Sequence, residues 1–182
     1  MVVARKPLNG VVSSCSVTGF VTLDNEAPIG KQHISDETLM RAALDLAAEA
    51  GERGEVPVGA VVALDGTIVG RGRNQPIGGQ DPTAHAEVVA IRDAALRVGN
   101  YRLTGSTMYV TIEPCLMCVG AMVHARIGRV VYGAPEPKAG AIVSSARVHE
   151  LPGLNHRFEV TAGVLEEECR SVIQAFFAER RK

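Results

Sequence analysis

Two cysteines of this chain have the types and the spacing that a metal site requires. Cys115 and Cys118 stand three positions apart, so a helix would project both thiols from one face. Pro114, directly before them, suits a helix start, where unpaired N–H groups and the helix dipole favour thiolates over thiols. Two such sulfurs predict a clamp for a soft or borderline cation, with zinc as the default choice.

A third ligand is predicted at His85, which opens another helix well before the cysteine pair. The N-termini of successive helices in a parallel α/β domain gather at one edge of the sheet, so the imidazole and the two thiols can meet in space. Three protein ligands leave the fourth tetrahedral position of zinc for water, which is typical of a catalytic site. We therefore predict one Zn²⁺ per chain, bound by His85, Cys115 and Cys118.

A carboxylate follows the predicted histidine ligand at a distance of two residues. Glu87 beside a metal-bound water would take its proton and pass it onward. On a regular helix, residues two apart lie roughly 200° around the axis, so both side chains face one pocket only if His85 occupies the irregular edge of its helix. The pattern His-x-Glu with Pro-Cys-x-x-Cys resembles the signature of zinc-dependent deaminases, which predicts Glu87 as the catalytic residue.

The cysteine pair alone also fits a redox dithiol or half of a structural zinc site. A structural site requires a fourth protein ligand, and none of the candidates has tight spacing to the pair. These candidates are Cys169, His124, His149 and His156. Gly70-x-Gly72 lacks the rest of a dinucleotide-binding fingerprint and precedes a predicted loop, so it predicts no cofactor site.

Periodicity predicts the elements that position these residues. Ser35 is a predicted N-cap, and apolar residues then repeat at helical spacing until Gly51. Asp65-Gly66 predicts a tight hairpin between two β-rich runs. The expected strands are 58–64, 67–73, 107–112, 129–132 and 158–161, and the expected helices are 36–50, 84–98, 115–126 and 165–180, with loops at 76–82 and 135–140.

This order of elements predicts the fold class α/β, with helices on both faces of a mixed five-stranded sheet. Within the helix at 84–98 we expect Val88, Ile91, Ala95 and Val98 to face inward. Residues 1–33 lack a sustained period and are expected to form a poorly ordered N-terminal extension. Residues 34–182 are expected to form one domain.

The composition is that of an ordinary globular protein. Hydrophobic residues make up 46% and charged residues 21% of the 182 residues, and the formal net charge is −1. No stretch approaches the ~20 apolar residues of a membrane-spanning helix, so no membrane association is expected. Four cysteines do not suggest a disulfide scaffold, and free thiols suit a reduced cytoplasmic setting.

Several segments together resemble one family, the bacterial tRNA-specific adenosine deaminases. The matching segments are EVPVGAV at 55–61, NQPI at 74–77, DPTAHAE at 81–87, NYRL at 100–103, EPCLMC at 113–118 and the run from Gly120 to Val131. The resemblance covers about residues 36 to 181, and residues 1–33 lie outside it.

The resemblance implies a three-layer α/β/α cytidine deaminase-like fold and a homodimer. It also implies hydrolytic deamination of adenosine to inosine at the wobble position of the tRNA anticodon loop. The same resemblance implies that Asn74 and the backbone of Ala86 contact the base. The family often has Arg and Asp where Pro135 and Glu136 stand here, which leaves the RNA-facing role of that loop open.

Two other functions remain open on the sequence alone. A zinc-dependent deaminase of a free base or nucleoside, of the guanine or cytosine type, would use the same metal site. A non-catalytic RNA-binding zinc module would need neither the fourth coordination position nor Glu87. The apolar run Val119–Val123 is a candidate surface for dimerisation.

Overall fold

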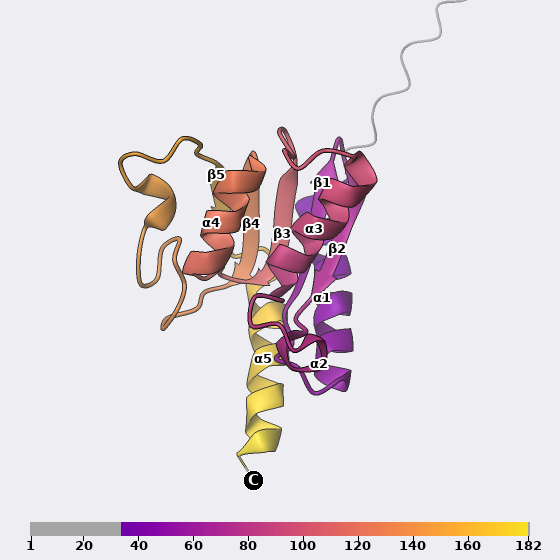
Figure 1. Cartoon of the computed structure of the whole chain (residues 1–182). Coiled ribbons are helices and arrows are strands. Elements are labelled where there is room, and N and C mark those ends of the chain that lie inside the picture. The colour runs from indigo at the N-terminus through magenta and orange to yellow at the C-terminus, as the bar shows by residue number, and fades with distance from the viewer. Residues whose placement is uncertain (1–33, 182) are drawn as a thin grey trace, which may run out of the picture. The chain divides into compact units, whose positions relative to one another are not determined.

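The computed structural model describes residues 34–181, so the prediction for residues 1–33 lies outside the described part of the chain. Figure 1 shows the elements, with the colour following the chain from α1 to α5. They are α1 (Asp36–Glu52), β1 (Gly59–Leu64), β2 (Thr67–Arg73), α2 (Pro76–Gly79), α3 (Ala86–Val98), β3 (Thr107–Ile112), α4 (Leu116–Ala125), β4 (Arg129–Ala134), the short 3-10 helix η1 (Val148–Glu150), β5 (Glu159–Ala162) and α5 (Glu166–Arg180).

The five strands form one mixed sheet in the order β2-β1-β3-β4-β5. β1 runs antiparallel to both β2 and β3, whereas β3, β4 and β5 run parallel to one another. β2 and β3 therefore point in the same direction, and the helices that follow them, α3 and α4, begin at the same edge of the sheet. This edge is where the predicted metal ligands must meet.

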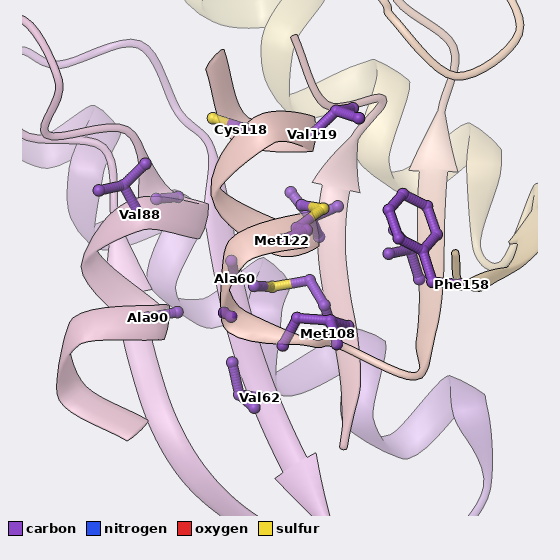
Figure 2. Close-up of a cluster of buried hydrophobic side chains, with 14 of the residues drawn as sticks. Ala60, Val62, Val88, Ala90, Met108, Cys118, Val119, Met122 and Phe158 are labelled. Carbon is purple, nitrogen blue, oxygen red and sulfur yellow. The ribbon is translucent and has the colours of Figure 1, made fainter. Parts of the chain in front are cut away.

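The sheet separates two apolar clusters because side chains alternate between its faces. On one face, α3 and α4 pack over side chains such as Val62, Met108 and Val130. Figure 2 shows part of this cluster, with Met108 and Met122 between α4 and the strands. On the other face, α1 and α5 cover a cluster that includes Val61 and Tyr109. The predicted three-layer α/β/α architecture is confirmed.

Glycines on the strands let the helices lie directly on the backbone of the sheet. A Cβ at Gly72 would stand 2.1 Å from the carbonyl oxygen of Ala86, and one at Gly70 would stand 2.4 Å from that of Ala90. A Cβ at Gly59 would meet α1 as closely, 2.0 Å from the oxygen of Ala43. The Gly70-x-Gly72 pattern is thus a helix-packing feature of β2.

This close contact corrects the predicted inner face of α3. The helix buries Ala86, Ala90 and Ala94 against β2, because only small side chains fit where the backbones approach each other. Val88 is buried as predicted, but Val98 is exposed.

Other local predictions are confirmed or corrected by the structure. Asp65 and Gly66 both have positive φ, at 49° and 78°, as a two-residue hairpin turn of the predicted kind requires. The loop predicted at 76–82 contains the short helix α2, which Pro76 begins. The first helix passes through Gly51 and ends at Glu52.

The apolar run 119–123, considered from the sequence as a dimer surface, is only partly accessible, at Gly120 and Ala121. Val119, Met122 and Val123 are buried in the cluster under α4, so their side chains are not available to a partner. Within residues 34–181, no helix is both long enough and apolar enough to cross a membrane.

Candidate metal centre and active site

His85 lies at the junction between a loop and α3. It is the N-cap residue of this helix, and its backbone is extended, with φ −69° and ψ 151°. Asp81 shapes the loop before it by accepting hydrogen bonds from the backbone N–H and the hydroxyl of Thr83, at 2.8 and 2.6 Å. The helix thus begins at Ala86, two residues later than predicted, and His85 occupies the irregular edge that the pairing with Glu87 requires.

The two cysteines flank the first turn of α4. Cys115 is the extended N-cap residue and Cys118 is the third helical residue, so both thiols face the same side. The helix thus begins at Leu116, one residue later than predicted, and Pro114 directly precedes the N-cap. An antiparallel bridge between Cys115 and Gly140 ties this helix start to the loop after β4.

The three side chains converge with the geometry of a tetrahedral site. The Nδ1 atom of His85 lies 3.6 Å from each sulfur, and the two sulfurs lie 3.7 Å apart. Zinc–sulfur bonds of about 2.3 Å and zinc–nitrogen bonds of about 2.0–2.1 Å at tetrahedral angles place sulfurs about 3.8 Å apart and nitrogen about 3.6 Å from sulfur. The residues present therefore fit zinc, with three protein ligands.

A fourth protein ligand is not found among the residues that the structure describes. His85, Cys115 and Cys118 are the one group of potential ligands there that lie within 4.8 Å of one another. Cys169 is buried on the opposite face of the sheet, and His124 is exposed on α4.

The other two histidines considered as ligands, His149 and His156, lie in the segment between β4 and β5 and have other partners. His156 has its Nε2 atom 2.6 Å from the carbonyl oxygen of Ile127, and His149 stacks on Phe158. The arrangement matches the open coordination of catalytic zinc and lacks the closed set of a structural site.

Electrostatics within the group favour ionised ligand atoms at Cys115. Hydrogen bonding to Cys118 and to His85 lowers the pKa of Cys115 to about 4. The same contact with Cys115, together with burial, raises the pKa of Cys118. The hydrogen bond to Cys115 raises the pKa of His85. A cation at this point would replace the shared protons, since metal ligands bind in their deprotonated forms.

Beside the ligands lies a cavity of about 270 Å³. Glu87, which is 3% exposed, lines this cavity, and burial raises the pKa of its carboxyl group. Asn74, which is 9% exposed, also lines it, held by a hydrogen bond of 2.9 Å from its N–H to the oxygen of Val58. The cavity lies at the small end of typical ligand sites, so it suits one flat ring while the rest of a larger substrate stays outside.

Ala86, the second predicted base contact, is buried at the first position of α3 and is not among the residues that line the cavity. Its backbone N–H is one of the donors that a helix leaves without an internal partner. Together with Asn74 it provides hydrogen-bonding groups from two different elements near the metal ligands. Sequence reasoning missed the apolar walls of the cavity, which Ile173 and Phe177 of α5 supply.

Sequence reasoning also missed Glu113, which is 2% exposed. Although burial opposes its ionisation, hydrogen bonds from the side chain and backbone of Ser144 and from neighbouring N–H groups lower the pKa of Glu113. One carboxylate oxygen accepts from the N–H groups of Ile142, Val143 and Ser144 at 2.7–3.1 Å. The residue thereby fixes the loop after β4 against the strand end that leads to Cys115. The sequence did offer a signal for Glu113, since an acidic residue there separates an apolar strand from the Pro-Cys pair.

Comparisons with known proteins agree with this geometry. The family described as the cytidine and deoxycytidylate deaminase zinc-binding region matches residues 33–134. A tRNA-specific adenosine deaminase of Haemophilus influenzae is 51% identical over 148 residues, which cover 81% of this chain and 86% of the relative. The Bacillus subtilis protein of the same name is 45% identical over 147 residues, or 81% and 91% of the two chains.

A solved structure extends the likeness to three dimensions. It comes from a study of A-to-I editing by tRNA:A34 deaminases at the wobble position of transfer RNA. That chain is 45% identical to this one and superposes with a TM-score of 0.72, over 74% of this chain and 97% of the solved one.

Proposed function

This chain belongs to the cytidine and deoxycytidylate deaminase zinc-binding family and, within it, to the tRNA-specific adenosine deaminases, and from this we propose that it converts adenosine to inosine at the wobble position of a tRNA anticodon. One observation carries the choice of substrate: the 51% identity to a protein named for that activity extends over 148 residues. The free-base alternative has no comparable support among the relatives described above.

In this proposal His85, Cys115 and Cys118 hold one Zn²⁺ per chain. Zinc at such a site lowers the pKa of water towards ~7, which supplies a nucleophile at neutral pH. The placement of both His85 and Cys115 at extended N-cap positions supports this role, because each side chain can then reach the common point without distorting its helix.

Glu87 is proposed to move the protons. Its carboxylate takes a proton from the attacking water and delivers it to N1 of adenine while the water oxygen bonds to C6. Glu87 then carries the remaining proton of that oxygen to the amino group, the bond between C6 and the amino nitrogen breaks, and ammonia leaves inosine behind. The raised pKa of Glu87, caused by burial, brings this group closer to the working pH of a general acid and base. Asn74 and the backbone N–H of Ala86 are proposed to orient the base in the cavity.

The substrate must present an unstacked adenosine. Unstacking is least costly in a loop, and the anticodon loop provides such a nucleotide. The cavity of about 270 Å³ accommodates the base but not the surrounding RNA, which must lie against the surface of the protein. We further propose a homodimer in the cytoplasm, as the resemblance to the family implies.

The deciding experiment compares an anticodon stem-loop carrying adenosine at the wobble position with free adenosine, adenine, guanine, cytosine and cytidine. We expect inosine in the stem-loop and ammonia release in proportion, at one zinc per chain. Ammonia from the small substrates alone would establish the free-base alternative. Binding of the stem-loop without any inosine would establish a non-catalytic RNA-binding module.

A further inference from the structure

A second cavity, of about 370 Å³, lies where β2 ends. It is lined by residues from three segments: the end of α1, the turn before β1, and the stretch from β2 into α2. These residues are Arg53, Glu55, Arg73, Gln75, Gly78 and Gly79. We call it the arginine cavity. The cavity beside His85 and Cys115 is called the metal-site cavity below. No residue that lines the metal-site cavity also lines the arginine cavity.

The two arginines of this cavity have no acidic partner in the part of the chain that the structure describes. Within residues 34–181, neither Arg53 nor Arg73 has a carboxylate oxygen within 4.0 Å of its guanidinium nitrogens. The Nε atom of Arg73 is buried and has no hydrogen-bond partner among the described residues. A guanidinium group has five N–H donors in a planar fork, which matches the oxygens of a phosphate group.

Glu55 does not neutralise this charge by an ion pair, because its carboxylate is engaged elsewhere. It is buried and accepts hydrogen bonds from the backbone N–H groups of Ile77 and Gly78, at 3.3 and 2.7 Å. The carboxylate thus anchors α2 as one wall of the cavity. Gly78 and Gly79 carry no side chains, and Gly79 has open space where a Cβ would lie, so a ligand can come close to the backbone there.

The arginine cavity lies next to the metal-site cavity, because residues adjacent in the sequence line one cavity or the other. Arg73 and Gln75 line the arginine cavity, whereas Asn74 between them lines the metal-site cavity. In the same way, Glu55 lines the arginine cavity and Val56 lines the metal-site cavity. Two neighbouring backbone segments therefore separate the cavities, and adjacent residues serve one or the other.

We propose that the arginine cavity binds a phosphodiester group of the substrate RNA, next to the nucleotide whose base enters the metal-site cavity. This inference rests on the proposed function. A base inserted beside Asn74 places its own backbone outside the metal-site cavity, and Arg73 and Arg53 lie on the far side of Asn74 with unpaired positive charge. Phosphate contacts of this kind position a nucleic acid and make its binding dependent on salt.

The test uses the zinc-loaded full chain, an anticodon stem-loop with adenosine at the wobble position, and the variants Arg53→Gln, Arg73→Gln and Arg73→Lys. Each glutamine variant should raise KM about tenfold and leave kcat within about twofold, since the contact acts on binding and not on chemistry. The slope of log Kd against log salt should fall by about 0.7–0.9 for each lost contact. Compared with Arg73→Gln, Arg73→Lys should recover most of the salt slope but only part of the affinity. Lysine keeps the positive charge but lacks the planar guanidinium group that matches two phosphate oxygens.

The control is Arg97→Gln, which removes one positive charge, paired with Asp93 at 2.9 Å, from the last turn of α3, at the end away from His85. It should leave both KM and the salt slope unchanged. Unchanged slopes in Arg53→Gln and Arg73→Gln, with an active wild-type protein, overturn the inference and leave the proposed function intact. A lower Tm in Arg73→Gln with an unchanged slope also overturns it, by assigning Arg73 to the fold. A wild-type protein that forms no inosine in the stem-loop instead overturns the proposed function.

Discussion

Helix α1 and helices α3 and α4 begin in contrasting ways. The N-cap residue of α1 is Ser35, whose hydroxyl oxygen accepts the N–H of Thr38 at 3.2 Å, and acidic residues fill the first turn. The N-cap residues of α3 and α4 are His85 and Cys115, and neither makes a capping hydrogen bond with its side chain. All three residues have the same extended backbone, so they differ in what the side chain is used for.

The N-cap side chain therefore stabilises the helix in α1, whereas in α3 and α4 it serves the candidate functional site. A serine cap typically contributes about 0.5–2 kcal/mol to a helix or a protein, relative to alanine. The two helices on the other face of the sheet give up that contribution, and their N-cap side chains point to the proposed metal site instead. The N-cap positions of α3 and α4 are thus proposed to hold metal ligands in place of capping side chains. Substitutions should separate the effect on stability from the effect on metal binding.

The largest effect is expected for Cys115→Ser. Serine is a preferred N-cap residue but a poor zinc ligand, so bound zinc and deaminase activity should both fall to background. In the presence of a chelator, the same variant should be more stable than Cys115→Ala by about 0.5–2 kcal/mol, because serine can cap α4. Metal analysis, the stem-loop assay and urea unfolding check the three parts. Full zinc content in Cys115→Ser would remove Cys115 from the ligand set.

A large effect on turnover alone is expected for Glu87→Gln. This variant keeps the shape of the buried side chain and loses the group that transfers protons, so kcat should fall about 10²–10⁴-fold while zinc stays at one per chain. Single-turnover kinetics and metal analysis on the same preparation provide the measurement. Loss of zinc together with activity would contradict the proton-transfer role and would place Glu87 in the support of the metal.

On the opposite face, Ser35→Ala should cost about 1 kcal/mol of unfolding free energy and leave kcat and KM unchanged. The reason is that Ser35 caps α1 and lies outside the residues that line the metal-site cavity. Urea unfolding of zinc-loaded protein measures the loss, and Ser35→Thr serves as the conservative control that should retain most of the stability. An effect on deamination larger than about twofold would break the separation between the two faces.

An effect of similar size is expected for Tyr109→Phe, also on the face covered by α1. The phenol O–H donates to Asp36 at 2.8 Å, and Arg129 binds the same carboxylate. Removal of the hydroxyl should cost about 0.5–1.5 kcal/mol of unfolding free energy. Activity should not change, because Tyr109 faces the cluster under α1 and does not line the metal-site cavity.

The pH dependence of this effect has a defined sign. Burial, then the hydrogen bond to Asp36, raises the pKa of Tyr109 above its ordinary value of about 10. The folded protein therefore keeps a proton that the unfolded chain loses. The stabilisation is complete below pH about 10 and declines as the pH rises through the folded-state pKa. Thermal unfolding at neutral pH and above pH 10 should show a smaller alkaline loss of Tm in Tyr109→Phe than in the wild type.

The sequence contained enough information to predict the meeting of the metal ligands. The Asp65-Gly66 turn predicted a hairpin, and the alternation of strands and helices predicted parallel crossovers, whose helices begin at one edge of the sheet. The N-cap at Ser35 was also predictable, because its hydrogen bond is to Thr38 in the same turn. These features depend on neighbours in the sequence or on general rules of topology.

Features that depend on contacts between distant segments could not be predicted. Periodicity placed Val98 on the inner face of α3, but the glycines of β2 select the alanine face, and this choice is visible only when the two backbones are together. Glu113 likewise has no periodic signature, since its hydrogen-bond donors lie about thirty residues later in the chain. The division of Arg73 and Asn74 between two cavities follows from the turn at the end of β2 and from no local motif.

The contact of α3 with Gly70 and Gly72 limits how this active site can diversify. At Gly70 and Gly72 the backbone of α3 rests on that of β2, so β2 has no side chain there that could be exchanged to move His85. The floor of the site is therefore constant, and any change of substrate must come from the walls, which Phe177 of α5 and Glu136 of the loop after β4 help to form. Attempts to redirect the enzyme to other nucleotides should accordingly begin with those two segments.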